Sequence, residues 1–158
     1  PVYISAILPR RIYYMAKIEL FQNRVLRWII EYFGAFPVQR GEADLRAIRT
    51  ALAHLKEGKA IGIFPEGRIQ ESYHTEIKQG AAYLAIRGDA SVLPVFVTGT
   101  GRALKKGKKW IKPVKVRVIV GRPLRAEGTG AFRERQEQFS QQIAQALQDL
   151  SQLKPDNV

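Results

Sequence analysis

The sequence predicts an α/β fold in which a mostly parallel central sheet is flanked by helices. Short segments rich in β-branched and aromatic residues alternate with segments of helical periodicity. One strand–helix–strand run, over residues 35–64, is a connection that places parallel strands side by side. With 158 residues, 46% of them hydrophobic and 25% charged, the chain fits one globular domain with its own core.

The first predicted elements are a buried turn and a strand. Residues 1–9 are mainly apolar and uncharged, which predicts a helix or helical turn packed inside, and residues 12–16 follow as a short strand. Lys17 comes directly after that strand. A cation there either reaches a phosphate at the carboxyl edge of the sheet or is a surface lysine, and the pattern alone favours the surface lysine.

An amphipathic helix is predicted over residues 19–33, ending at Gly34. Packing against the core is the interpretation that its spacing favours. Its apolar side is broad, however, and Trp28, Tyr32 and two arginines also fit a helix that lies in a membrane interface. The residues of the apolar side are Phe21, Val25, Leu26, Trp28, Ile29, Tyr32 and Phe33.

The strand–helix–strand run comes next. Residues 35–41 contain Pro37, which predicts a strand at an edge or an irregular crossing. Asp44 suits the start of a helix, whose apolar stripe ends near Gly58. His54 lies off that stripe and is predicted to be a surface residue.

A short apolar run over residues 60–64 suits a buried strand, and Pro65 ends it. The loop that follows lies at the carboxyl end of the strand, where open α/β sheets bind ligands. Arg68 offers a fork suited to phosphate or carboxylate, and Gly67 allows a close backbone approach. An ordinary turn with Glu66 and Arg68 in water fits the spacing equally well.

The second half of the chain predicts two helices and two strands. Residues 77–87 form a helix of small residues, and residues 131–153 form a helix that caps the sheet. Residues 91–98 are a buried strand whose Pro94 marks an edge or a bulge. Residues 114–120 alternate apolar with basic side chains, as a strand with one wet face does.

The densest basic segment lies between the last two strands, over residues 99–113. A basic loop with a tryptophan suits an anionic membrane surface or the phosphates of a nucleotide-bearing ligand, and a solvated charged loop is the plain alternative. The residues concerned are Arg102, Lys105, Lys106, Lys108, Lys109 and Trp110.

Composition narrows the chemistry further. A formal charge of +12 attracts phosphates, on lipid, nucleic acid or a soluble molecule. The absence of cysteine excludes disulfides and thiolate chemistry, and two histidines are too few for a histidine-rich metal site, so no bound metal or cofactor is expected. No apolar run approaches the roughly 18 residues of a membrane-spanning helix.

Five blocks between Lys17 and Leu124 resemble, in the same order, those of the glycerolipid acyltransferases, the family that includes the 1-acylglycerol-3-phosphate acyltransferases. FPEGR at residues 64–68 resembles the phosphate-binding motif of the family, usually F-P-E-G-T-R-S. Here Arg68 follows the glycine directly, and Ile69 stands at the usual arginine position. The blocks are AKIEL, GAFPVQR, FPEGR, LPVFVTGT and GRPL.

The resemblance implies a glycerol-phosphate acyltransferase-like fold and transfer of a fatty acyl group from acyl-CoA or acyl-carrier protein to a hydroxyl of a lysophospholipid or glycerol phosphate. It assigns the acceptor phosphate to Arg40 and Arg68, with Lys17 as a third cation, and includes Glu66 and Gly67 in the same loop. A carboxylate beside a phosphate repels it, so Glu66 is expected to hold the loop instead. A peripheral position at the cytoplasmic face of a membrane is also implied.

In the resembled family the chemistry depends on a His-x-x-x-x-Asp motif, whose histidine takes the proton from the acceptor hydroxyl. This chain lacks that motif, because the fifth residue after His54 is Lys59 and the fifth after His74 is Gln79. We therefore expect no catalytic residue within this sequence.

The expected domain covers residues 1–153, lacks its N-terminal part and is inactive alone, with residues 154–158 as a tail. One rival interpretation is a non-catalytic basic module that binds anionic membrane or nucleic acid through residues 102–112. The absence of helix-turn-helix, RNA-binding and zinc patterns argues against nucleic acid. Another rival is an active enzyme that uses His74, which has no partner at catalytic spacing.

Overall fold

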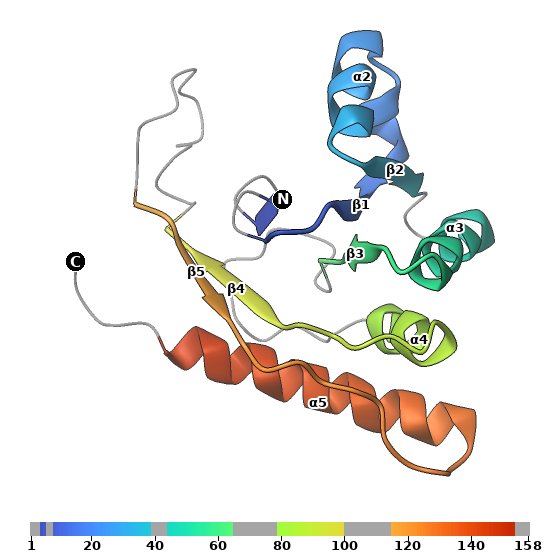
Figure 1. Ribbon diagram of the computed structural model, residues 1–158, viewed down its shortest axis with the longest axis vertical. Helices are drawn as coiled ribbons and strands as arrows, with labels where there is room; N and C mark the ends of the chain where they lie inside the picture. Colours follow the sequence, from blue (N-terminus) through green and yellow to red (C-terminus); the bar gives the residue numbers. More distant parts are fainter. Residues whose placement is uncertain (1–3, 6–7, 39–43, 65–78, 100–114, 154–158) are drawn as a thin grey trace.

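The computed structural model describes residues 4–5, 8–38, 44–64, 79–99 and 115–153, with only the backbone of Lys17 (Figure 1). It confirms an α/β fold. The elements are β1 (Ile12–Lys17), the 3-10 helix η1 (Ile18–Phe21), α2 (Arg24–Tyr32), β2 (Ala35–Val38), α3 (Leu45–Lys56), β3 (Ala60–Gly62), α4 (Gly80–Arg87), β4 (Val95–Thr98), β5 (Arg117–Val120) and α5 (Phe132–Gln152).

The parallel sheet has the strand order β2-β1-β3. The expectation that the strands on either side of α3 would be neighbours is therefore wrong, because β1 lies between β2 and β3. The central position suits β1, which is apolar on both faces: Ile12 and Tyr14 are buried on one, and Tyr13 and Met15 join the core on the other. Pro37, which has no N–H to donate, lies on the edge strand β2 as predicted.

The second sheet is the antiparallel pair of β4 and β5. The strand predicted over residues 91–98 is shorter than expected, since β4 begins at Val95. Before it, Val92 forms an isolated bridge with Leu124, and the carbonyl of Pro94 accepts a bond from the N–H of Gly121 at 2.9 Å. The proline thus marks an interruption of the ladder, as its position in the sequence predicted.

Two apolar clusters share the helix α4, which lies between α3 and α5 (Figure 1). One joins α3 and α4 to the parallel sheet through Phe36, Ala51 and Leu84. The other joins α4 to α5 through Ala82, Ala85, Phe139 and Ile143. Alanines at the contact let α4 approach both neighbouring helices closely.

The predicted helix over residues 19–33 is divided in two. Asn23 caps α2, because its side-chain oxygen accepts hydrogen bonds from the N–H groups of Val25 and Leu26, and the chain turns at Gly34 with φ +81°. The favoured interpretation, packing against the core, is wrong. No residue of α2 is buried among the described residues, and α2 projects away from α3 and α4, which cover one face of the sheet (Figure 1).

Candidate functional site

The carboxyl edge of the parallel sheet is where the predicted phosphate ligands should meet. Parallel strands end at the same edge, and the pairing register places the Cα of Lys17, the last residue of β1, opposite that of Val38, the last of β2. On the other side of β1, Tyr14 pairs with Gly62 of β3. Phe64, two residues after Gly62, therefore lies level with Ala16, two residues after Tyr14. The chain therefore leaves all three strands at nearly the same level.

Most of the predicted site residues lie outside the described part of the chain. This holds for Arg40 and for Glu66, Gly67 and Arg68, which follow β2 and β3 by a few residues, and for the side chain of Lys17. It also holds for the basic segment and for His74. The predicted residues of the basic segment are Arg102, Lys105, Lys106, Lys108, Lys109 and Trp110. Their roles stay predictions, and what the structure adds is the arrangement of the strands that precede the first group.

The strand order gives this edge a second significance. From β1 the chain first adds β2 on one side and then crosses over to add β3 on the other side. The strand order therefore reverses at β1. In open α/β sheets, ligands bind outside the carboxyl ends of the strands at such a point. The topology therefore selects the carboxyl ends of β1 and β3 without reference to any motif.

Phe64, the first residue of the FPEGR loop, is held by an aromatic contact. The ring of Phe64 stacks on that of Tyr14, with centroids 6.2 Å apart. The hydroxyl of Tyr14 shares a hydrogen bond of 2.9 Å with Ser5, which ties the N-terminal turn to β1. The sequence analysis did not predict these contacts of Tyr14. The only signal for them was the period of two along the strand, which places Ile12 and Tyr14 on one face.

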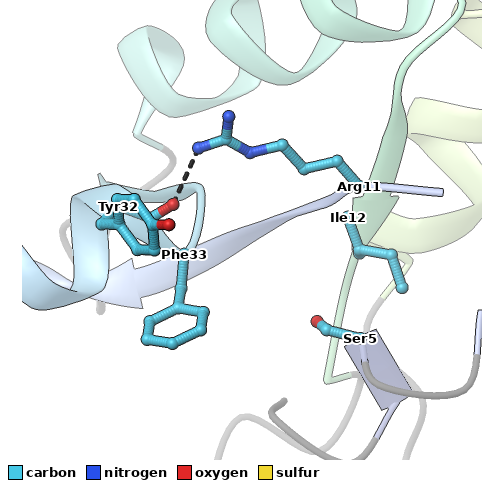
Figure 2. A pocket seen from close by; sticks show the side chains of 5 residues that line it. All are labelled: Ser5, Arg11, Ile12, Tyr32 and Phe33. Atoms are coloured by element: carbon cyan, nitrogen blue, oxygen red, sulfur yellow. Dashed lines mark hydrogen bonds between the residues drawn. The ribbon is translucent and has the colours of Figure 1, made fainter.

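A hollow of about 360 Å³ opens at the opposite, amino edge of the sheet (Figure 2). It is lined by Ser5, Arg11, Ile12, Tyr32 and Phe33. The guanidinium of Arg11 donates to the backbone oxygen of Tyr32 at 2.8 Å, so it satisfies a carbonyl at the C-terminal end of α2. Nothing in this lining points to acyl-transfer chemistry.

His54 is not a surface residue, contrary to the sequence-based prediction. Its ring stacks on Tyr13 at 4.4 Å and meets Phe36 edge-on at 5.7 Å, so it fills the contact between α3 and the sheet. Its Nδ1 is buried without a hydrogen-bond partner in the described structure. A base in acyl transfer needs an acid that orients its ring, and His54 has no hydrogen bond to an acid among the described residues.

An ion pair lies next to Tyr13 at the amino edge of the parallel sheet. Lys59 Nζ lies 5.2 Å from the centre of the Tyr13 ring and pairs with Glu57. The hydrogen bond and charge of Lys59 lower the pKa of Glu57, and the hydrogen bond that Lys59 donates to Glu57 raises the pKa of Lys59. Both side chains remain accessible to water, so the pair is a surface feature and not a reactive centre.

Neither a metal centre nor a membrane span is found within the described ranges. No three of their His, Asp or Glu side chains are grouped so that they could hold a metal ion. None of the described helices combines the length and the apolar character that crossing a bilayer requires.

Comparison with known proteins gives a consistent result. The family model described as Acyltransferase matches residues 1–98. A 1-acyl-sn-glycerol-3-phosphate acyltransferase of Bacillus subtilis (strain 168) is 39% identical over 118 residues, covering 75% of this chain and 57% of its relative. An enzyme of the same name from Streptococcus pneumoniae (strain ATCC BAA-255 / R6) is 36% identical over 101 residues, covering 63% of this chain and 37% of its relative.

Among solved structures, the 1-acyl-sn-glycerophosphate (LPA) acyltransferase PlsC from Thermotoga maritima superposes with a TM-score of 0.67 at 25% identity. The superposition covers 92% of this chain and 58% of PlsC. The chain thus spans about half of the length of the relatives that it matches.

Proposed function

This chain belongs to the acyltransferase family, and we propose that its protein transfers a fatty acyl group from an acyl thioester to a hydroxyl of a 1-acylglycerol 3-phosphate or a related glycerol phosphate. The names of its relatives in Bacillus subtilis and Streptococcus pneumoniae support this acceptor class. Acyl-CoA and acyl-carrier protein are the two candidate donors, and both present a thioester to the attacking hydroxyl.

One observation carries the proposal: three parallel strands end at one edge, at the point where the strand order reverses. Strands lie about 4.8 Å apart, so β2 and β3 are separated by roughly 10 Å with Lys17 between them. Arg40 comes two residues after the end of β2, and Arg68 four residues after Phe64. At about 3.5 Å per residue, both are within reach of one phosphate group beside Lys17.

The proposed roles follow from chemistry. Three cations more than neutralise a phosphate dianion, and an arginine fork fixes two of its oxygens. Gly67 lets the backbone approach the ligand. Glu66 holds the loop, by accepting backbone N–H bonds or pairing with an arginine, because its own charge would repel the phosphate.

Acyl transfer also needs a base that removes the hydroxyl proton, so that the oxygen attacks the thioester carbonyl and the thiol leaves. In the proposed mechanism this base is a histidine oriented by an aspartate five residues later. No such pair occurs in the 158 residues. Acceptor binding, and not turnover, is therefore the property that this sequence can be tested for.

The test compares the binding of acceptor and donor by calorimetry. Arg68→Ala should weaken the binding of glycerol 3-phosphate at least tenfold and leave the binding of coenzyme A unchanged. Arg133→Ala removes an exposed arginine of α5 and serves as the matched control. Equal losses for both ligands, or an equal loss in the control, would remove Arg68 from the acceptor site.

For the donor, we propose that the basic segment with Arg102, Lys105, Lys106, Lys108, Lys109 and Trp110 contacts either the donor phosphates or an anionic membrane. Its density of positive charge supports both. Replacing Lys108 and Lys109 together by Ala should weaken coenzyme A binding if the segment serves the donor, and weaken only vesicle binding if it serves the membrane. A peripheral position at the cytoplasmic face belongs to the same proposal.

A further inference from the structure

The helix α2 and the 3-10 helix before it carry the largest group of exposed apolar side chains in the described structure. Val25, Trp28 and Tyr32 are each 70% exposed. They are joined by Ile18, Leu20, Leu26, Ile29 and Phe33. Contiguous apolar surface of this kind marks an interaction site, because isolated exposed side chains are normal but clusters are not.

Four exposed apolar residues of α2 form one face. At about 100° per residue, Val25, Trp28, Ile29 and Tyr32 fall within an arc of roughly 100°. The rings of Trp28 and Tyr32 stack with centroids 6.1 Å apart, and Tyr32 meets Phe33 edge-on at 5.6 Å. The face is therefore a preformed aromatic surface, with a polar N–H and O–H that suit a boundary between water and an apolar phase.

Positive charge lies beside this face. Arg24 borders the face, about 40° around the helix from Trp28, and Arg27 is on the opposite side. Arg11 is bonded to the C-terminal end of α2 through the carbonyl of Tyr32. The single acid of α2, Glu31, is paired with Arg27 at 2.8 Å. The surroundings of the apolar face thus have a net positive charge, which complements an anionic surface.

The apolar surface also begins next to the proposed acceptor site. The helix η1, with exposed Ile18 and Leu20, follows directly after Lys17 at the carboxyl end of β1. A lipid whose phosphate lies at that edge would have its acyl chain in a bilayer close by. Continuity with the site therefore favours a membrane over a protein partner as the occupant of the face.

We propose that α2 docks on an anionic bilayer, with Val25, Trp28, Ile29 and Tyr32 at the boundary between head groups and acyl chains and Arg24, at the border of this face, against the phosphates. The choice of a lipid surface rests in part on the proposed function. The docking itself is measured without an acceptor, so that its failure and the failure of acceptor binding are distinguishable.

The two tryptophans of the chain make the test specific. In Trp110→Phe, Trp28 is the sole reporter, and vesicles of phosphatidylglycerol and phosphatidylcholine should shift its emission to shorter wavelength. Lipids brominated on the acyl chain should quench it. In Trp28→Phe, the remaining reporter Trp110 shows whether the basic segment inserts as well.

Removing the face should remove the docking. In the Trp110→Phe background, Val25→Ser with Tyr32→Ser should lower partitioning into the anionic vesicles at least tenfold. Leu153→Ser, which removes a similarly exposed apolar side chain beyond α5, should leave partitioning unchanged. Part of the binding should persist in high salt because apolar burial contributes, whereas binding by charge alone collapses.

Three results would overturn the proposal. The first is that vesicles bind the protein through another part: the emission of Trp28 then stays unshifted, and brominated lipids quench Trp110 but not Trp28. The second is shielding of Trp28 from acrylamide before vesicles are added, which would assign the face to a second copy or another part of the protein. The third is partitioning that is unchanged by the two serine substitutions.

Discussion

The ring of Tyr14 occupies the space that a side chain at position 62 would need. A Cβ on Gly62 would overlap that ring and would lie 3.0 Å from Cγ2 of Ile12. Tyr14 is buried, and its hydroxyl is bonded to Ser5, so it cannot move aside without breaking that contact. The glycine in β3 is therefore a packing requirement of the sheet edge that leads to the FPEGR loop.

We predict that Gly62→Ala lowers the free energy of unfolding by about 1–3 kcal/mol, the usual cost of overpacking a filled core. Urea denaturation followed by circular dichroism measures it. The matched control is Gly80→Ala at the start of α4, where an added Cβ meets no atom within 4 Å. The control should stay within about 1 kcal/mol of the native protein, on the stabilised side, because alanine favours helix. An equal loss in both variants would contradict the packing argument.

The caps of α2 and α3 should differ in their effect on global stability. Asp44 accepts bonds from the N–H groups of Arg46 and Ala47, and α3 buries Ala47 and Ala51, so Asp44→Ala should lower the free energy of unfolding by about 1 kcal/mol. Asn23 makes equivalent bonds in α2, which buries nothing, so its loss can cost no more than the small free energy that α2 adds.

Hydrogen exchange separates the two effects. Asn23→Ala should reduce the protection of the α2 amides and leave that of the α5 amides unchanged, because α2 opens locally. Asp44→Ala should reduce protection throughout. Equal global losses would mean that α2 is part of the cooperative core, against its exposure in the structure.

Lys17 and Arg68 should act together on one phosphate group. We predict a coupling of about 0.5–3 kcal/mol between Lys17→Ala and Arg68→Ala in the binding of glycerol 3-phosphate, because both charges contact the same ligand. Calorimetric titration of the two single variants and the double variant measures the coupling. The pair Lys17→Ala and Arg133→Ala should be additive, and additivity of the first pair would place the two cations at separate sites.

Two substitutions of His54 separate the packing role of its ring from the chemistry of its nitrogen atoms. His54→Ala removes the ring that stacks on Tyr13 and should lower the free energy of unfolding by about 1–2 kcal/mol. His54→Phe keeps a ring and removes the buried, unpartnered Nδ1, so its stability should remain within about 1 kcal/mol of the native protein. Both variants should bind glycerol 3-phosphate normally, and weaker binding by His54→Phe would show a part in the site.

Much of the local structure could be predicted from the sequence. The caps and turns at Asp44 and Gly34 depend on a few neighbouring residues, and so does the placement of Pro37 on an edge strand. The division of the helix at Asn23 was missed, although an asparagine before a helical segment is a recognisable cap. The order of the acyltransferase blocks could also be read from the sequence, because a motif is defined by the order of residues along the chain.

The candidate site was predictable only in part. The sequence indicates which residues follow strand ends, and so it selects Lys17, Arg40 and Arg68 as phosphate ligands. It does not indicate which strands are neighbours. The expectation that β2 and β3 pair directly would have placed Lys17 at the margin of the site, whereas the observed order puts its strand between the other two.

By itself, then, the sequence determined the fold class and most element boundaries, since these depend on periodicity, capping and spacing among neighbouring residues. It also determined the family, through the order of five motif blocks along the chain. The tertiary structure alone decided three things: the central place of β1, the stacking of His54 between Tyr13 and Phe36, and the exposure of the apolar face of α2. Each depends on which distant segments come together. A helix with an apolar face has the same sequence pattern whether a core, a partner or a membrane covers it, because periodicity records that a face is apolar and not what lies against it.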